Sequence, residues 1–420
     1  MKIIQSYWSL PSENNEQNDE HGRSKGGWLH HKYNLMSWAF SCLKLREFYD
    51  QVELITDKKG KELLIDKLQL PYTSVKICLD EINNYNSKLW ALGKIYAYQI
   101  QDKPFLHVDG DVYIWNKFSQ DVEKAQLVVQ NIEVDYPWYG EIIETIKSKF
   151  SYVPSYISKV HNSEKPIISV CAGIMGGTNN TFFKKYTAEA LNFVEKNYSS
   201  LNEINIGLFN TVFEQYLFYC MAEHENINIF PCFPLEDFSK FSTIMSFNMA
   251  PLKYDYIHIA GSAKKDLFAC EQLELRLYKE YPNYYNKIIE FVNENSGKEK
   301  KLLAKKYKSR FKELFDILYK NDIEFFLNRK LSLNRNVKLS TDKKTQLSYI
   351  SYRNPITEKR ESQLFSDFDF VLNYFKVPCS GSEILSDLSN EGVEITDEIK
   401  IKLIDYLTDK LLYHRILDIA

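Results

Sequence analysis

The stretch FLHVDGDVYIW, residues 105–115, carries two aspartates, Asp109 and Asp111, at the end of an apolar run. The run predicts a buried strand, and charges at its edge need a partner because unpaired buried charge is costly. In an extended chain residues i and i+2 point the same way, so both carboxylates can face one ligand. Gly110 between them adds no side chain to crowd it, and carboxylate oxygens suit Mg²⁺ or Mn²⁺. For the motif alone, an ordinary Asp-Gly turn is the open alternative.

The composition argues against several classes of protein. A chain of 420 residues with a net charge of −3 gives no electrostatic reason to expect nucleic acid or an anionic membrane as a partner. No stretch approaches the roughly 20 apolar residues that span a bilayer, and residues 1–20 lack the pattern of a secretory signal. The seven cysteines form no CxxC pair, so neither a disulfide framework nor a zinc ribbon is expected. We expect a reduced, cytoplasmic protein of enzyme size.

Strand-like and helix-like segments alternate over residues 1–110, an order that predicts an α/β fold. The expected strands are 2–6, 52–55, 74–78 and 105–108, and the expected helices are 29–43, one that begins near 57, and 88–99, capped by Ser87. Helices between strands imply a mostly parallel, Rossmann-like sheet with helices on its faces. In such sheets ligands bind beyond the carboxyl ends of the strands, and the two aspartates follow one of these ends.

Composition changes along the chain predict four parts. They are an α/β domain at 1–266, a helical extension at 267–330, a polar linker or meandering loop at 331–365, and a small helical or winged-helix-like module at 366–420. Within the last part, helices are expected at about 382–389 and 396–412, so the C-terminal region is expected to be mainly helical. A helical cap that completes the α/β domain is the alternative for this last part.

Residues 87–115, SKLWALGKIYAYQIQDKPFLHVDGDVYIW, are similar to the segment of glycogenin-like, family 8 glycosyltransferases in which a lysine-bearing helix leads into the DxD strand. Three further stretches resemble motifs of that family in the same order: CAGIMGG (171–177), FEQYLF (213–218) and HIAGSAKKD (258–266). The resemblance covers about residues 1–270. It implies a GT-A-type fold and transfer of a sugar from a nucleotide-sugar donor, chiefly a UDP-sugar, with Mn²⁺ or Mg²⁺ as cofactor.

The resemblance also implies roles for residues of this chain. Asp109, Asp111 and His258 would hold the metal, and imidazole is a donor that Mn²⁺ accepts more readily than Mg²⁺. Glu214 or Gln215 would lie near the anomeric carbon as the catalytic contact, with retention of its configuration. The residues expected at the nucleotide sugar are Ser6, Tyr7 and Trp8 for base and ribose, Gly110, Gly173, Gly176, Gly177 and Gly261 where backbone approaches, and Lys88 and Lys264 for the phosphates.

The chain departs from the family pattern at three places. Cys171 replaces an Asn or Asp, Glu214 replaces an Asp, and Lys265-Asp266 stands where the family has Pro-Trp. Two other functions therefore stay open: a sugar-nucleotide-binding protein without turnover, and a nucleotidyltransferase, which also uses paired strand carboxylates and Mg²⁺.

Structural alternatives stay open for single residues. His258 can be a structural histidine, Lys88 a residue at the end of a surface helix, and Tyr7 and Trp8 core aromatics. The sequence does not name the acceptor, and a peptide, a protein or a glycan would each be compatible with the resemblance. Residues 366–420 resemble small winged-helix modules that clasp peptides by strand addition, which would suit a peptide acceptor.

Overall fold

The computed structural model describes residues 1–13, 25–161, 165–233, 245, 247, 255–295, 320, 322–341, 348–353, 359–364 and 369–420. The chain divides into two compact units: unit 1 comprises Met1–Ser246 and Asp255–Gly297, and unit 2 comprises Phe247–Tyr254 and Lys298–Ala420. None of the helices within the described ranges combines the length and apolar character that crossing a bilayer requires.

The centre of unit 1 is a sheet of seven strands, counted over the described residues, in the order β10-β6-β9-β4-β1-β2-β3. The strands are β1 (Lys2–Tyr7), β2 (Val52–Thr56), β3 (Ser74–Ile77), β4 (Phe105–Val108), β6 (Leu127–Val129), β9 (Ile174–Gly177) and β10 (Ile229–Pro231). The first four pair in parallel, with Ile4 opposite both Glu53 and His107. The predicted α/β fold with a mostly parallel sheet is confirmed. Ligands of such sheets bind at the carboxyl ends of the strands, where the strand order reverses; here that is the edge at β1 and β4.

Two glycines predicted to approach a sugar serve the sheet instead. Strand β9 lies antiparallel between β4 and β6, and Gly176 faces Leu106. A Cβ on Gly176 would lie 2.1 Å from the carbonyl oxygen of Phe105. Gly177 has φ +142°, and its Cβ would lie 2.1 Å from the carbonyl oxygen of Gln126. Close strand pairing therefore explains both glycines.

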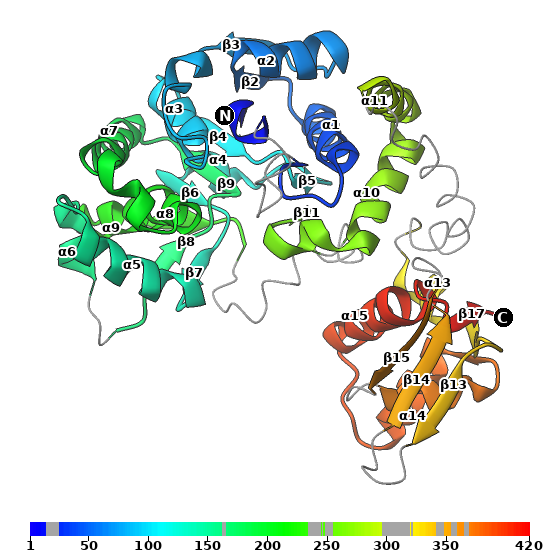
Figure 1. Ribbon diagram of the computed structural model, residues 1–420. Coiled ribbons are helices and arrows are strands. Elements are labelled where there is room, and N and C mark those ends of the chain that lie inside the picture. The colour runs from blue at the N-terminus through cyan, green and yellow to red at the C-terminus, as the bar shows by residue number, and fades with distance from the viewer. Residues whose placement is uncertain are drawn as a thin grey trace. The chain divides into compact units, whose positions relative to one another are not determined.

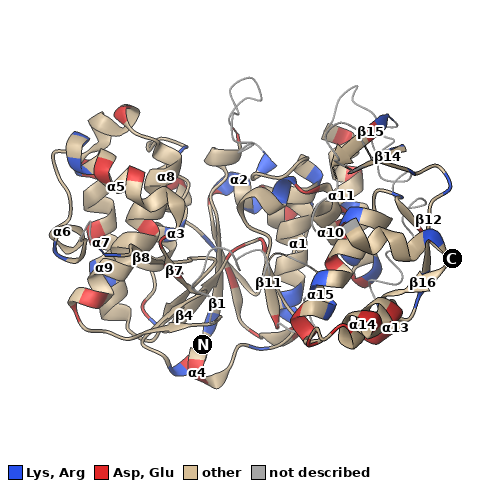
Figure 2. Ribbon diagram, turned by 90° about the horizontal axis from the view of Figure 1, so that it is seen from below, with Lys and Arg blue, Asp and Glu red and all other residues tan. Residues whose placement is uncertain are grey.

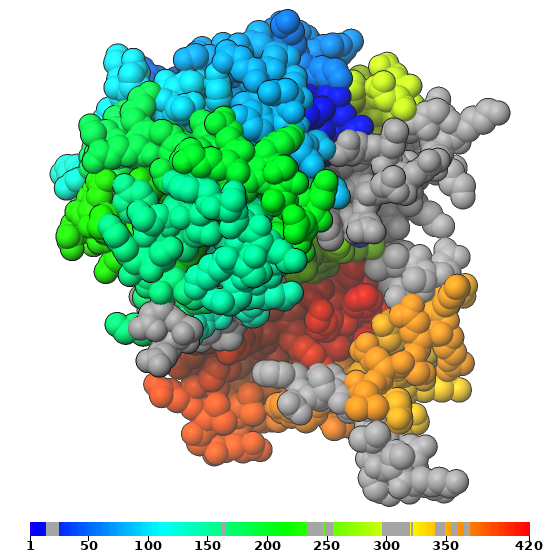
Figure 3. Space-filling model, turned by 60° about the vertical axis from the view of Figure 1, so that its left-hand side comes forward, coloured from blue at the N-terminus to red at the C-terminus, as the bar shows by residue number. Residues whose placement is uncertain are grey.

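Helices cover both sides of this sheet: Figures 1 and 2 show α1 on one side and α3 with α7 on the other. The helices of unit 1 are α1 (His31–Phe48), α2 (Lys58–Lys61), α3 (Leu92–Gln99), α4 (Gln120–Lys124), α5 (Pro137–Lys149), α6 (Ser155–Val160), α7 (Asn180–Lys196), α8 (Ile206–Thr211), α9 (Leu217–His224), α10 (Leu267–Glu280) and α11 (Pro282–Asn295). On the α3 side the core is aromatic, with the ring of Phe105 5.8 Å from that of Tyr98 and 4.8 Å from that of Phe183. In Figure 3 the segments from α5 to α9, teal to green, form one continuous surface.

Helix α3 begins at Leu92, four residues later than the sequence predicts. The side-chain amide of Asn210 explains the difference, because it accepts from the backbone N–H of Ala91 and donates to the carbonyl of Lys88, both at 2.9 Å. These bonds hold the backbone before α3 in turns. Lys88 is exposed and lies before the helix, in agreement with the alternative that it is a surface residue.

Unit 1 continues past the predicted domain boundary at residue 266. Helices α10 and α11 belong to it, since Lys32 of α1 forms an ion pair with Glu274 of α10 (2.7 Å), and Tyr285 of α11 donates to the same carboxylate (3.1 Å). The rest of the predicted helical extension up to Lys320, residues 296–319, lies outside the described residues.

Unit 2 contains strands where a linker is predicted. Strands β13 (Lys338–Thr341), β14 (Ser348–Arg353) and β15 (Arg360–Leu364) form an antiparallel sheet, so the prediction of a linker over 331–365 is wrong. The strand β14 forms because Ile350 and Tyr352, two positions apart, point to the same face and are buried there (0% and 4% exposed). This alternation covers only a few residues of a polar stretch, so the sequence pattern did not predict the strand.

A second sheet of unit 2 accompanies its helices. It pairs β12 (Lys330–Leu333) with β16 (Cys379–Ser380) and β17 (Leu417–Ile419). The helices are α13 (Ile323–Leu327), α14 (Gly381–Asn390) and α15 (Asp397–Asp405), followed by the π-helical turns Tyr406–Leu412. Acidic residues lie on α13 and α14, red in Figure 2. The two predicted helices are confirmed, but the region is a mixture of helices and strands, and its winged-helix character stays a prediction.

Candidate functional site

A cavity of about 650 Å³ opens at the carboxyl ends of β1 and β4. This volume is typical of sites for small molecules. Its walls are unusually aromatic, because five of the six tryptophans of the chain line it: Trp8, Trp28, Trp38, Trp90 and Trp138. All of the lining residues belong to unit 1.

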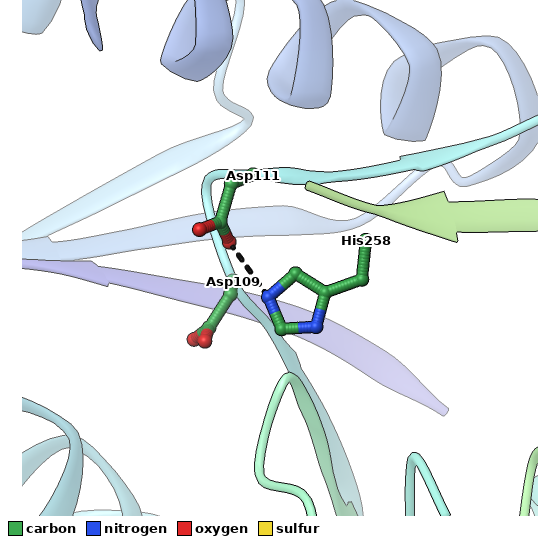
Figure 4. A group of neighbouring side chains, drawn as sticks. All are labelled: Asp109, Asp111 and His258. Atoms are coloured by element: carbon green, nitrogen blue, oxygen red, sulfur yellow. Dashed lines mark ion pairs between the residues drawn. The ribbon is translucent and has the colours of Figure 1, made fainter. Parts of the chain in front are cut away.

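Asp109, Asp111 and His258 meet at this cavity (Figure 4). Asp109 follows β4 and Asp111 precedes β5 (Val112–Ile114), while His258 ends β11 (Tyr256–His258). Antiparallel pairing of β5 with β11 sets His258 opposite Val112 and so brings the imidazole to the aspartates. One potential ligand atom from each of the three residues lies within 4.8 Å of the other two. The structure therefore brings these three residues together, as the sequence analysis predicts.

Gly110 holds the loop between the two aspartates against helix α1. Its carbonyl accepts a hydrogen bond from the Ser37 hydroxyl at 2.7 Å. A Cβ on Gly110 would lie 2.6 Å from the indole ring of Trp38. A side chain at this position would therefore push the loop away from α1 and displace the carboxylates on either side.

Lys94 of α3 joins the Asp109 side of the cavity, and the sequence analysis did not select it. Its Nζ lies 2.8 Å from Oδ2 of Asp109, 3.0 Å from Oε1 of Glu214 and 3.2 Å from the carbonyl oxygen of Ala172. Burial opposes the charged form of Lys94, but the two carboxylates outweigh it and raise its pKa. Lys94 is therefore a fixed ammonium between two acidic groups.

Glu214 lies behind Lys94. It is fully buried (0% exposed) on the π-helical turns Val212–Tyr216 and is not among the cavity-lining residues, whereas its neighbour Gln215 is. Burial raises the pKa of Glu214 to about 7, against the lowering effect of Lys94. Of the two predicted catalytic contacts, Gln215 thus faces the cavity and Glu214 contacts Lys94.

The two aspartates have opposite electrostatic surroundings. Burial raises the pKa of Asp109 even though Lys94 is beside it. Burial acts on Asp111 in the same direction, but the Lys264 ammonium at 2.5 Å and the His258 imidazole at 3.3 Å outweigh it and hold its pKa well below the usual range. Asp111 is therefore ionised at neutral pH.

A polar group on the cavity wall was missed by the sequence analysis. Glu133, in the middle of β7 (Ile132–Val134), accepts a hydrogen bond from the Tyr139 hydroxyl at 2.7 Å, and the same hydroxyl lies 3.3 Å from Oε1 of Gln215. Burial raises the pKa of Glu133 to about 8 and raises the pKa of the nearby Cys171 thiol further above its usual value. At neutral pH this wall presents a neutral carboxyl, an amide and a neutral thiol.

Ser6, Tyr7 and Trp8 line the cavity at the end of β1. Tyr7 and Trp8 are each 6% exposed, so they serve both the core and the wall. The Ser6 hydroxyl lies 2.9 Å from Nε2 of His107, a buried histidine of β4 that supports the Ser6 side chain.

The remaining predicted residues divide into two groups. Gly173, Gly261 and Lys264 line the cavity, and Gly261 has φ +53°, which favours glycine. Lys88, Gly176 and Gly177 are not among the lining residues. Lys94 lies in the same quoted sequence segment as Lys88 but within helix α3, where it is the one lysine among mainly apolar residues.

The donor set of Asp109, Asp111 and His258 fits a divalent cation. The set offers two carboxylates and one imidazole. It leaves further coordination positions for water or a ligand, as Mg²⁺ and Mn²⁺ sites commonly do. Two features favour this fit: the three ligand atoms lie within 4.8 Å of one another, and the three residues line the cavity. The adjacent ammonium groups of Lys94 and Lys264 add positive charge suited to an anionic ligand.

Comparisons with known proteins identify the family by sequence. No curated protein matches the chain. Among solved structures, the crystal structure of mouse xyloside xylosyltransferase 1 in its apo form is similar over 55% of this chain and 85% of that chain, with 11% identity and a TM-score of 0.31. The model of a family of unknown function, DUF6734, matches residues 1–291. The chain therefore belongs to the DUF6734 family.

Proposed function

We propose that the protein is a metal-dependent glycosyltransferase of the GT-A type, which moves a sugar from a nucleotide-sugar donor, a UDP-sugar, to a peptide, protein or glycan acceptor. The observation that carries this proposal is the convergence of Asp109, Asp111 and His258 on the wall of one cavity, with ligand atoms within 4.8 Å. The resemblance of four ordered motifs to glycogenin-like enzymes supports it.

The charges of the site suit a diphosphate. When bound, a divalent cation would neutralise charge on the departing nucleotide diphosphate. Lys264 is the protein's own phosphate contact: its side chain is one-fifth exposed and can turn from Asp111 to a ligand. Lys94 is held between Asp109 and Glu214 and keeps the Asp109 carboxylate oriented toward the cavity.

Two groups of cavity-lining residues suit the two parts of a nucleotide sugar. Tyr7, Trp8 and Trp38 offer aromatic surface, on which a nucleobase stacks favourably. Glu133 and Gln215 offer a carboxyl and an amide that can pair with sugar hydroxyls. The neutral Glu133 carboxyl can both donate and accept, which a carboxylate cannot.

A thermal-shift screen of nucleoside diphosphates, with and without Mn²⁺, tests the proposal. A ligand at about 100 times its Kd stabilises the folded state by about 2.7 kcal/mol, so binding raises Tm by several degrees. We expect one diphosphate, UDP, to raise Tm with Mn²⁺ and to do so far less without it. Asp109→Asn is the matched control and should abolish the metal-dependent part. No shift with any diphosphate would contradict the proposal.

The products separate the two alternatives. A glycosyltransferase slowly hydrolyses its donor and releases a nucleoside diphosphate, whereas a nucleotidyltransferase releases pyrophosphate from a triphosphate. A binding protein without turnover releases neither. We expect Mn²⁺-stimulated release of UDP from a UDP-sugar.

A further inference from the structure

Two buried polar atoms beside the metal-binding triad lack hydrogen-bond partners among the described residues. One is Nδ1 of His258, whose ring is 5% exposed, and the other is Oε1 of Gln130, which is fully buried. Buried polar atoms without partners are rare in folded proteins because each loses its bonds to water on folding. Two such atoms that neighbour each other therefore call for one explanation.

The two atoms approach the same point. A Cβ on Gly173 would lie 2.3 Å from Oε1 of Gln130 and 2.5 Å from Nδ1 of His258. Only glycine leaves this space free, so the amide oxygen and the imidazole nitrogen can close on each other there. The carbonyl of Gly173 also accepts the backbone N–H of Asp109 at 2.9 Å, which ties the same residue to a second member of the triad.

The orientation of the Gln130 amide follows from its other contact. Its Nε2 donates to Oδ1 of Asn131 at 3.2 Å, which leaves the oxygen for His258. The backbone of Gln130 is also fixed, because its N–H donates to the carbonyl of Cys171 at 3.1 Å and its carbonyl accepts from the N–H of Phe233 at 2.8 Å. The glutamine is thus a rigid acceptor aimed at the far side of the imidazole.

We propose that Gln130 is a positioning residue for the metal site: its Oε1 accepts a hydrogen bond from Nδ1–H of His258. This bond fixes the tautomer in which the proton is on Nδ1, so that Nε2, which lies 3.3 Å from Oδ1 of Asp111, carries the free electron pair toward the cavity. Metal-bound histidines commonly donate their second nitrogen in this way, and the partner orients the ring. The inference rests on the proposed metal-dependent function.

Electron paramagnetic resonance of free Mn²⁺, titrated into the full-length protein, measures the effect without any assay of activity. Gln130→Leu removes the acceptor at similar volume, and we expect it to weaken Mn²⁺ binding by about 10- to 100-fold. Gln130→Glu keeps an acceptor and should stay within a few-fold of wild type. Gln101→Leu is the matched control. Gln101 is also buried (3% exposed), but its side-chain amide donates to the carbonyl of Ala97, away from His258.

The outcomes separate this inference from the proposed function. Loss of affinity in Gln130→Leu, with Gln130→Glu and Gln101→Leu near wild type, supports the positioning role. Unchanged affinity in Gln130→Leu, with loss in His258→Ala, overturns the role of Gln130 and leaves the metal site intact. Unchanged affinity in both Gln130→Leu and His258→Ala contradicts the metal site itself.

A measurement on the wild-type protein covers the case in which Gln130→Leu fails to fold. Selective ¹⁵N labelling of histidine, in the Mg²⁺-loaded protein, distinguishes the two imidazole tautomers by nitrogen chemical shift. The comparison of wild type with His258→Ala assigns the resonance. A proton on Nδ1 of His258 supports the inference, and a proton on Nε2 overturns it.

Discussion

Asp109 and Asp111 are separated by one glycine, yet they belong to two different electrostatic regions. Asp109 faces inward to Lys94, which is shared with the buried Glu214, so two carboxylates compete for one ammonium. Asp111 faces outward to Lys264 and His258, so one carboxylate has two positive or polarisable partners. The pKa of Asp109 is accordingly raised and that of Asp111 lowered.

The difference indicates a division of labour. The inner region, Asp109 with Lys94 and Glu214, has an excess of acid that a bound cation would compensate. The outer region, Asp111 with Lys264 and His258, has partners that can turn to an incoming anion. A cation and a diphosphate should therefore bind together more tightly than either binds alone, because each supplies a partner that the other region lacks.

The largest expected effect comes from removing a carboxylate. Asp109→Asn and Asp111→Asn should each weaken Mn²⁺ binding by more than about 100-fold, because a metal ligand is worth more than a group that only orients one. Donor hydrolysis should fall at least as far. Asp121→Asn, on α4, is the control. Full turnover in either site variant would remove that aspartate from the site.

Lys94→Met tests the inner region through stability. It leaves Asp109 and Glu214 facing each other with no cation, and breaking a buried ion pair from one side costs about 3–5 kcal/mol. Lys88→Met, at an exposed position, should change the free energy of unfolding by less than about 0.5 kcal/mol. Chemical denaturation measures both.

A double variant sharpens the same comparison. Lys94→Met with Glu214→Gln removes one competing charge and should recover much of the lost stability, but not Mn²⁺-dependent donor hydrolysis. Equal stability of Lys94→Met and Lys88→Met would contradict the inner ion network.

Lys264→Met tests the outer region through ligand binding. A hydrogen bond to a charged group contributes about 1.5–3 kcal/mol, which corresponds to about 10- to 100-fold in the Kd for UDP with Mn²⁺. Lys124→Met, at an exposed position on α4 and not among the cavity-lining residues, is the control. Calorimetric titration distinguishes them, and equal affinities would show that Lys264 does not contact the diphosphate.

The effect of Glu133→Gln is measured as a pH dependence of stability. The folded-state pKa of Glu133 is raised to about 8 from 4.5, so between these values the unfolded state loses the proton while the folded state keeps it. The contribution of the Glu133 carboxyl to the free energy of unfolding is therefore complete below pH 4.5. It falls by up to about 1.4 kcal/mol per pH unit as the pH rises toward 8. Glu133→Gln should flatten that fall in urea denaturation from pH 5 to 9. Parallel pH profiles for variant and wild type would contradict the raised pKa.

The sequence predicts those parts of the site that follow directly from strand ends. Alternating elements and an apolar run before Asp109 are enough to predict the sheet and the position of both aspartates. His258 was expected from a motif resemblance, and its approach to Asp111 depends on the pairing of β5 with β11. That pairing has no signal in the stretch around either residue.

The parts that the sequence does not predict depend on contacts between distant segments. Lys94 lines the cavity and Lys88 does not, because Asn210, more than a hundred residues later, holds the backbone at Lys88 and Ala91 in turns before α3. No motif marks Glu133 or Gln130, and only the folded chain brings Tyr139 of α5 to Glu133 and His258 close to Gln130. The strands of unit 2 are missed because alternation at Ile350 and Tyr352 is too short to stand out.

Anomalous diffraction at the manganese edge, from crystals grown with Mn²⁺ and UDP, tests the central claim most directly. We expect one strong peak within coordination distance of Asp109, Asp111 and Nε2 of His258, next to the diphosphate. A peak elsewhere in the cavity, or a diphosphate bound at the triad with no manganese beside it, would contradict the account.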